Sequence, residues 1–145
     1  MAQPSSTPQR TDGRGTPRFP DTKPAGRRIL VADDNADSAE TCAMLLQLWG
    51  HDVRVAADGQ QALDLAAQFR PDIALIDIGM PRLSGYQVAE ALRRTDWGRK
   101  IVLVAVTGWG HEEDKQKAAA AGFDRHLSKP VDPHDLQPLI EEISR

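Results

Sequence analysis

Five polar side chains of this sequence could together carry out phosphoryl chemistry. They are Asp33, Asp34, Asp77, Thr107 and Lys129, and each stands at or just beyond the end of an apolar run. Three carboxylates sharing one crevice would repel one another by roughly 4 kcal/mol per pair, at about 4 Å and an effective dielectric near 20. The lysine, or a hard divalent ion such as Mg²⁺ that favours oxygen ligands, would have to neutralise them. One carboxylate could then attack a phosphoryl group, and the threonine hydroxyl could hydrogen-bond a phosphoryl oxygen.

Short apolar runs that alternate with segments of helical period must position these side chains. The apolar runs predict strands at residues 29–32, 53–55, 73–77, 101–106 and 125–127. Val53 and Val55 alternate with polar neighbours, which indicates a half-buried edge strand, whereas run 101–106 is continuous enough for a central strand covered on both faces.

Helical spacing of apolar residues predicts one helix after each strand. The first has Asp37 as its expected N-cap, with Cys42, Leu45, Leu46 and Trp49 facing inward, and ends at Gly50. The second buries Ala62, Leu65, Ala66 and Phe69, and the third begins at about Ser84 with Val88, Ala91 and Leu92 inward. The fourth spans 112–121 and ends at Gly122; the fifth follows Asp132 and Pro133, with Leu136, Leu139, Ile140 and Ile143 in register although Pro138 interrupts them.

Five strands alternating with five helices predict an α/β fold with a doubly wound parallel sheet. Ligands of such sheets bind beyond the carboxyl ends of the strands. The first strand ends at Asp33 and Asp34, the third at Asp77, the fourth at Thr107 and the fifth just before Lys129. The five polar side chains should therefore meet at one edge of the sheet.

Composition limits where the protein works and what it binds. The chain of 145 residues has 40% hydrophobic and 27% charged residues, which suits one globular domain. Its net charge of −3 gives no general reason to bind nucleic acid. No apolar run approaches the roughly 18 residues of a membrane span. The start lacks the apolar stretch of a secretory signal, and Cys42 is the only cysteine, so a reducing, cytoplasmic location is expected.

The first 26 residues differ in kind from the rest. They contain five of the ten prolines, a slight excess of basic side chains, and Phe19 as their only large apolar side chain besides Met1. Such a segment cannot bury enough surface to offset its ordering entropy, so we predict a disordered tail over 1–26 and a folded domain over 27–145. A basic arm that touches a partner is the alternative for the tail.

Four segments resemble, in this order and at this spacing, the response-regulator receiver domain, the CheY-like module of two-component signalling. They are ILVADDN, LIDIGMPRLSG, VAVTG and HLSKP, and the resemblance covers about residues 27 to 144. It implies a flavodoxin-like fold with strand order 2-1-3-4-5. It also implies that Asp77 accepts a phosphoryl group from a histidine kinase, a histidine phosphotransfer protein or a small phosphodonor.

The same resemblance implies a role for each remaining site residue. Mg²⁺ would be held by Asp33, Asp34, Asp77 and the backbone carbonyl of Gly79. Thr107 and Lys129 would bind the phosphoryl group, and the bond between Lys129 and Pro130 would be cis. A protein-binding face made from the fourth helix, fifth strand and fifth helix would then change between two arrangements and be read by a downstream protein, with no role for nucleic acid or membrane.

Several positions depart from the common pattern of this family. His126 occupies the switch position, three residues before the lysine, where Tyr or Phe is usual; the alternative is a partly buried histidine that does not switch. Gly79 and Trp109 occupy two positions that tune hydrolysis in the family. Ser84 replaces an acidic residue, which we expect to alter only helix capping.

Two rival functions and one question of context remain open at this point. A receiver fold that no longer takes phosphate would serve only as an interaction module. An aspartyl-phosphate phosphatase would be an enzyme, but it usually has a second aspartate two residues after the nucleophile, where this chain has Gly79. We expect a self-phosphorylating and self-dephosphorylating switch rather than an enzyme. It would be either a stand-alone receiver or part of a hybrid kinase, without a DNA-binding output domain.

Overall fold

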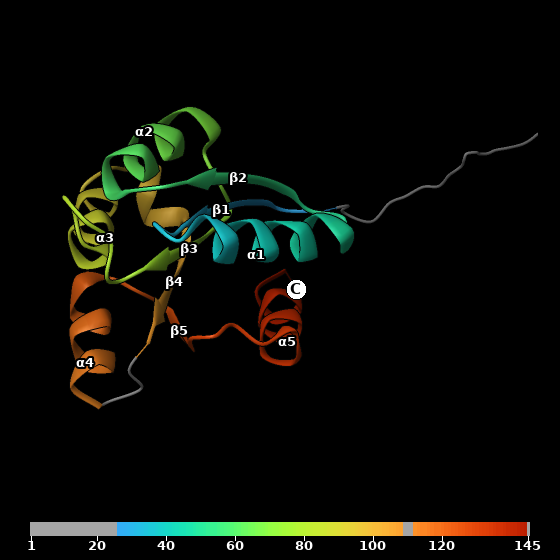
Figure 1. The fold of residues 1–145 in the computed structure, drawn as a ribbon. Helices are drawn as coiled ribbons and strands as arrows, with labels where there is room; N and C mark the ends of the chain where they lie inside the picture. The colour runs from blue at the N-terminus through green and yellow to red at the C-terminus, as the bar shows by residue number, and fades with distance from the viewer. Residues whose placement is uncertain (1–25, 109–111, 145) are drawn as a thin grey trace, which may run out of the picture.

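A parallel sheet of five strands forms the centre of the protein, with helices on both faces (Figure 1). The computed structural model describes residues 26–108 and 112–144. In chain order the elements are β1 Arg28–Ala32, α1 Ala36–Leu48, β2 Asp52–Ala56, α2 Gly59–Phe69, β3 Ile73–Asp77, α3 Gly85–Arg93, the 3₁₀ turn η1 Gly98–Lys100, β4 Val102–Thr107, α4 Glu112–Ala121, β5 Arg125–Ser128 and α5 Pro133–Ser144. The strand order β2-β1-β3-β4-β5 confirms the predicted α/β fold. No helix in the described part of the chain is both long and apolar enough to cross a membrane.

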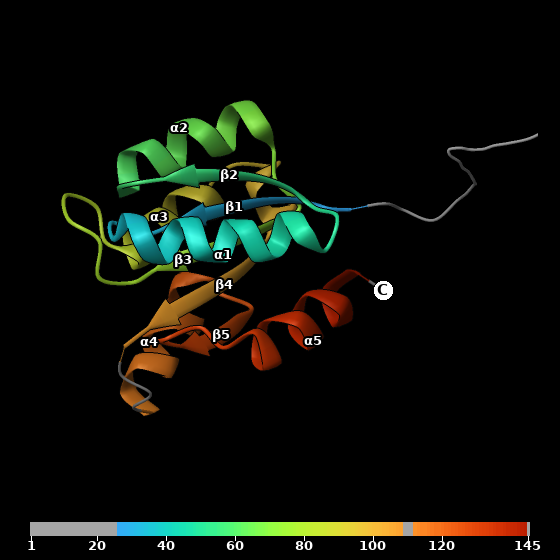
Figure 2. The same ribbon diagram turned by 45° about the vertical axis from the view of Figure 1, so that its right-hand side comes forward.

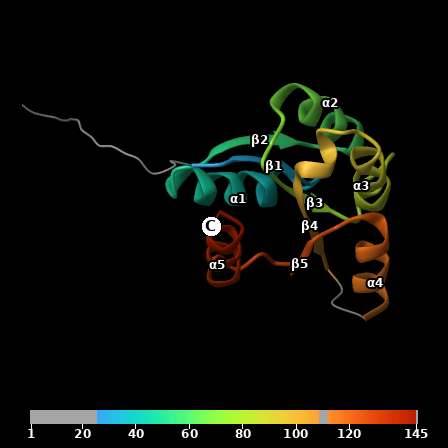
Figure 3. The ribbon, with the colours of Figure 1, turned by 180° about the vertical axis from the view of Figure 1, so that it is seen from behind.

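The two faces of the sheet are covered by different helices (Figures 2 and 3). Alternate residues of each central strand point to opposite faces, so β4 contributes to two apolar cores. Leu103 and Ala105 pack in one core with residues of α2, α3 and α4, and Val104 and Val106 pack in the other with residues of α1 and α5. Because β1, β3 and β4 are covered on both faces, their sequences are nearly continuous apolar runs.

Two details of the predicted packing are wrong. Val55 is 40% exposed, because β2 lies at the edge of the sheet and buries only Val53 and Ala56. On α1 the buried positions are Ala39, Ala43 and Leu46, so only Leu46 of the four residues predicted to face inward is buried. The larger side chains Cys42, Leu45 and Trp49 are only half-buried along its border.

Helix starts follow local capping chemistry, with one correction to the sequence analysis. Asn35, not Asp37, caps α1: its side chain accepts a hydrogen bond from the amide of Ser38 at 3.0 Å. Several adjacent residues here are good N-caps, and the extended backbone at Asn35 decides among them. At α3, Ser84 and Gln87 form a reciprocal capping box, which replaces the missing acidic residue.

Arg93 joins four segments at the amino-terminal edge of the sheet, a set of contacts that the sequence analysis did not predict. Its guanidinium donates to the carbonyl oxygens of Gly122, Gly98 and Ile101 at 2.8 to 2.9 Å. It also pairs with Asp124 at 2.7 Å. The planar fork of an arginine suits this use because it offers five donors in fixed directions.

Candidate functional site

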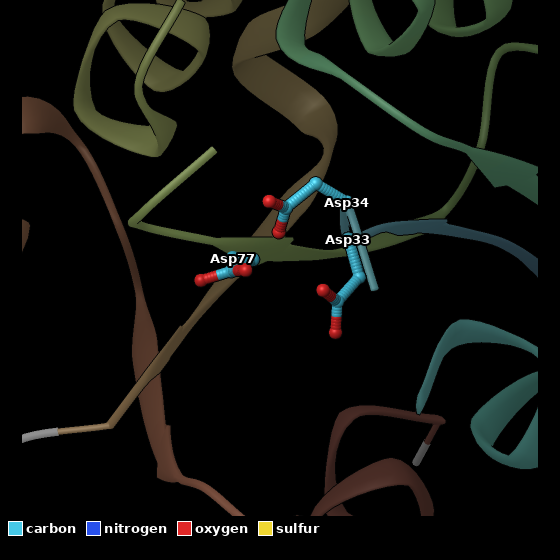
Figure 4. Close-up of side chains that lie close together, drawn as sticks. All are labelled: Asp33, Asp34 and Asp77. Carbon is cyan, nitrogen blue, oxygen red and sulfur yellow. The ribbon is translucent and has the colours of Figure 1, made fainter. Parts of the chain in front are cut away.

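Three carboxylates converge at the carboxyl ends of β1 and β3 (Figure 4). One carboxylate oxygen from each of Asp33, Asp34 and Asp77 lies within 4.8 Å of the others. Asp33 and Asp77 are 8% and 6% exposed, whereas Asp34 faces solvent. The strands β1 and β3 are parallel neighbours, so their last residues emerge side by side at the same edge. The predicted convergence of the three aspartates is therefore present.

Backbone hydrogen bonds fix the two buried aspartates. The amide of Asn35 donates to Asp33 Oδ1 at 2.9 Å, and the amide of Gly79 donates to Asp77 Oδ1 at 3.0 Å. Each carboxylate thus turns back onto the loop that leaves its own strand. Gly85 packs against the end of β3 so closely that a Cβ there would lie 2.7 Å from the backbone oxygen of Asp77. Glycine is required at that position because any side chain would displace the strand end.

Lys129 reaches into the acidic cluster from the loop after β5. Its Nζ lies 2.8 Å from Asp77 Oδ2 and 3.4 Å from Asp33 Oδ2. Its backbone amide donates to the carbonyl of Thr107 at 2.8 Å. The bond to Pro130 is cis, as the family resemblance implied. The ammonium therefore pairs with side chains at the ends of both β1 and β3, although its backbone follows the edge strand β5.

The charges of this cluster perturb one another. Burial raises the pKa of Asp33, and the Asn35 amide and Lys129 only partly oppose that effect. Burial alone would lower the pKa of Lys129, but its hydrogen bond to Asp77 and the attraction of both carboxylates outweigh burial, so that pKa is raised. The lysine thus remains an ammonium ion beside the two aspartates.

The donor set fits a hard divalent cation. Three carboxylates and one ammonium leave two negative charges in a space less than 5 Å across. All the available ligand atoms are oxygens, which Mg²⁺ prefers. Asp33, Asp34 and Asp77 are placed to hold such an ion, while the ligand role of the Gly79 carbonyl stays a prediction.

Small residues lie at the carboxyl ends of β3 and β4. Thr107, the last residue of β4, is 4% exposed and lies at the same edge of the sheet as Asp77. Counting only residues 26–108 and 112–144, a Cβ on Gly79 would meet Asp77 Oδ1 alone, at 3.8 Å, and a Cβ on Gly108 would meet nothing within 4 Å. Trp109, the other position expected to tune hydrolysis, lies outside the described residues.

A groove of about 470 Å³ opens beside the cluster, between α1 and the connection from β5 to α5. Asp33 and Lys129 form part of its wall, and its floor consists of apolar residues of the sheet, among them Val31 and Leu75. Cys42 also lines it, and burial followed by the charge of Asp33 raises the pKa of that thiol to about 11. The sequence did not predict this groove, because its width depends on the distance between α1 and α5 in the folded protein.

His126, the predicted switch residue, lies on β5, apart from the acidic cluster. Its ring is half-buried, and its Nε2 is buried without a hydrogen-bond partner among residues 26–108 and 112–144. Its position next to α4 agrees with the expected switching face, but the structure alone assigns it no motion.

Comparison with known proteins gives a consistent family. The model of the response regulator receiver domain matches residues 29–141. A curated relative from Leptolyngbya boryana, an uncharacterized 14.6 kDa protein, is 33% identical over 114 residues, which are 79% of this chain and 87% of that protein. The chain spans only about half the length of several other curated relatives, transcriptional regulators among them.

Solved structures give the same result. The chemotaxis protein CheY4 of Vibrio cholerae is 28% identical with a TM-score of 0.78, over 82% of this chain and 99% of that one. The receiver domain of sensor histidine kinase PA1611 from Pseudomonas aeruginosa is 30% identical with a TM-score of 0.76, over 83% of this chain and all of that one. The PA1611 structure has a magnesium ion coordinated in its active-site cleft.

Proposed function

Because the chain belongs to the response regulator receiver domain family of two-component signalling, we propose that Asp77 accepts a phosphoryl group from a phosphohistidine. The donor would be a histidine kinase or a histidine phosphotransfer protein, with a small phosphodonor as substitute. One observation carries this proposal: the carboxylate of Asp77 is buried at the end of β3, 2.8 Å from the ammonium of Lys129 and within an acidic cluster suited to Mg²⁺.

The proposed reaction is an in-line transfer between two nucleophiles. A carboxylate oxygen of Asp77 attacks phosphorus, the P–N bond to the donor imidazole breaks, and its electron pair returns to that ring nitrogen. The product is an acyl phosphate on Asp77. In the second step, which returns Asp77 to its free form, a water oxygen attacks phosphorus, the P–O bond to Asp77 breaks, and inorganic phosphate leaves.

The residues around Asp77 would mainly supply position and charge. Mg²⁺, held by Asp33, Asp34 and Asp77, would neutralise charge on the phosphoryl oxygens. Lys129 already donates a hydrogen bond to Asp77. After phosphorylation it would donate a hydrogen bond to a phosphoryl oxygen. The hydroxyl of Thr107 would donate to another. Gly79 and Gly108 themselves would present no side chain to an approaching donor protein or water molecule.

The output would be a change of surface rather than turnover of a substrate. Hydrogen bonds to a charged group contribute about 1.5–3 kcal/mol each. Two such bonds, from Thr107 and Lys129, approach the roughly 5.5 kcal/mol that turns a 1:99 equilibrium into 99:1. We therefore propose that phosphorylation shifts the face of α4, β5 and α5 between two arrangements that a downstream protein distinguishes, with His126 as the moving aromatic ring.

Intact-mass spectrometry after incubation with Mg²⁺ and acetyl phosphate tests the proposal. We expect a gain of one phosphoryl group, lost on treatment with hydroxylamine, and no gain in Asp77→Asn. A folded protein that never gains the group, from acetyl phosphate or from phosphorylated histidine donors, would instead be an interaction module. Rapid release of many equivalents of phosphate would indicate a phosphatase.

A second aspartate substitution controls for nonspecific phosphorylation of carboxylates. Asp72, like Asp77, accepts a hydrogen bond from a backbone amide, in its case that of Arg28, but it is exposed and lies at the opposite edge of the sheet. The Asp72→Asn variant should be phosphorylated at the rate of the unsubstituted protein.

A further inference from the structure

The side chains of His126 and of Thr107, the predicted phosphoryl ligand, lie on the same face of the sheet. In the register of β4 and β5, His126 lies opposite Ala105, two residues before Thr107. Ala105 packs in the core that includes Ala118 and Ala121 of α4, whereas Leu127 packs in the other core. By alternation the imidazole therefore faces α4, beside the small side chain of Ala105.

The buried end of this ring is poorly suited to carry charge. Nε2 of His126 is buried and makes no hydrogen bond to any residue that the structure describes. A buried polar atom without a partner costs free energy, and a buried positive charge costs more. Burial therefore lowers the pKa of His126, and the nearby ammonium of Lys115 lowers it further. Burial in this position therefore favours the neutral form of the ring.

The charged groups near the ring come from α4. Asp114 opposes the lowering of the His126 pKa, and Lys115 supports it. Across from α4, the hydroxyl of Tyr86 on α3 also senses the charge of Asp114. The adjacent β4 residue, Ala105, has no charge to contribute. Asp114 is thus the partner to which an imidazolium would turn if the ring moved toward solvent.

We propose that His126 is a proton-binding site whose occupancy opposes the phosphorylated arrangement, so that a proton and a phosphoryl group exert opposite effects on the α4–β5 surface. This inference rests on the proposed function, because it needs Thr107 to move toward a phosphoryl group on Asp77. In this proposal, the movement of Thr107 favours the neutral ring in its buried position beside Ala105. A protonated ring would instead turn outward toward Asp114, because its charge resists burial.

Linkage fixes the sign of the effect. If phosphorylation favours the buried ring, it must lower the proton affinity of His126, and protonation must weaken phosphorylation by the same factor. The negative charge of a phosphoryl group alone would have the opposite effect. That charge would lie at the ends of β1 and β3, whereas His126 lies on β5 beyond β4, so we expect the change in burial of the ring itself to decide the direction.

Two measurements test the proposal with beryllofluoride as the phosphoryl analogue. The first is an NMR titration of the His126 imidazole with and without Mg²⁺ and beryllofluoride, with the signal assigned from His126→Phe. We expect the analogue to lower the pKa of His126. The second is the dissociation constant of the analogue at pH 7.5 and pH 5.5. We expect the loss of affinity at the lower pH to exceed that of His126→Phe by on the order of fivefold, the lower end of typical coupling between two sites.

Substitutions on α4 provide matched controls outside the phosphoacceptor site. Asp114→Asn should reduce the proton affinity of His126 and flatten the pH dependence of analogue binding, whereas Lys115→Gln should steepen it. Their opposite signs cannot arise from general destabilisation. They also test the proposal if His126→Phe does not fold.

The possible results separate this inference from the proposed function. A His126 pKa that is unchanged or raised by the analogue would overturn the proton link, even if Asp77 is phosphorylated normally. A pH dependence equal to that of His126→Phe would do the same. No binding of the analogue at any pH, together with no acyl phosphate on Asp77, would overturn both.

Discussion

Replacing Asp34 with Asn should weaken metal binding and yet raise the melting temperature when metal is removed. The Asp34 carboxylate lies within 4.8 Å of those of Asp33 and Asp77. At this separation each pair repels by about 3.5 kcal/mol at an effective dielectric of 20, and by about 0.9 kcal/mol if water screens it fully. Asp34 is exposed, so the lower figure is the better guide.

Other contributions reduce the gain but do not reverse it. Asp34 lies just before α1, where an acidic residue is favoured by about 0.3–1 kcal/mol. Repulsion from two neighbours exceeds this, and a net gain of about 1 kcal/mol remains. For a domain of this size that gain corresponds to an increase in melting temperature of roughly 3–6 °C. The difference should shrink in high salt, because exposed charges are screened.

Thermal unfolding in EDTA and in excess Mg²⁺ measures both parts of the effect. In EDTA the Asp34→Asn variant should melt above the unsubstituted protein. In Mg²⁺ the order should reverse, because a ligand at 100 times its dissociation constant stabilises the protein that binds it by about 2.7 kcal/mol. Glu40→Gln, which removes an exposed charge elsewhere on α1, should change neither value appreciably. If Asp34→Asn melted lower in EDTA, mutual repulsion would not dominate the cluster and the reasoning would be refuted.

Three further predictions concern other parts of the structure. Arg93→Ala should lower the free energy of unfolding by at least about 2 kcal/mol in urea titrations, since it removes charged donors from three backbone carbonyls; Arg93→Lys should recover only part of it. Gly85→Ala should lower the free energy of unfolding by about 1–3 kcal/mol and slow phosphorylation, because its Cβ would lie 2.7 Å from the backbone oxygen of Asp77. The control Gly79→Ala should fold normally, because the nearest contact of its Cβ is 3.8 Å away. Cys42, with a pKa of about 11, should react with iodoacetamide at pH 8 roughly 100-fold more slowly than a thiol of pKa 9.0, and an equal rate would contradict its buried position.

The sequence was sufficient for the fold and for the convergence of the acidic residues. The apolar runs of β1, β3 and β4 are continuous because both faces of these strands are covered, and a parallel sheet brings their carboxyl ends to one edge. Asp33, Asp34 and Asp77 could therefore be placed together before any coordinates were known. Lys129 could be placed at the same edge because it follows the last strand directly, whereas its cis bond to Pro130 was expected only from the family resemblance.

Features that depend on long-range partners could not be predicted. Arg93 stands in the last turn of an amphipathic helix, and its sequence neighbours give no sign of acceptors on η1 and at the end of α4. The exposure of Val55 accompanies the position of β2 at the edge of the sheet, and alternation alone does not show which apolar residue of an edge strand stays uncovered. Asn35 and Asp37 are both good N-caps, and only the backbone conformation distinguishes them.

The Arg93 junction lies at the end of the sheet opposite the proposed phosphoacceptor site, and this separation affects how the protein can change. Arg93 ties α3 to the chain on either side of α4, and Asp124 also accepts from the amide of Leu103 at the start of β4. The described residues of the loops after β3, β4 and β5 make no part of that junction. Exchanging those loops with related proteins should therefore alter phosphoryl lifetime and partner choice while the scaffold keeps its cohesion, which makes the chain a suitable host for transplanted signalling specificity.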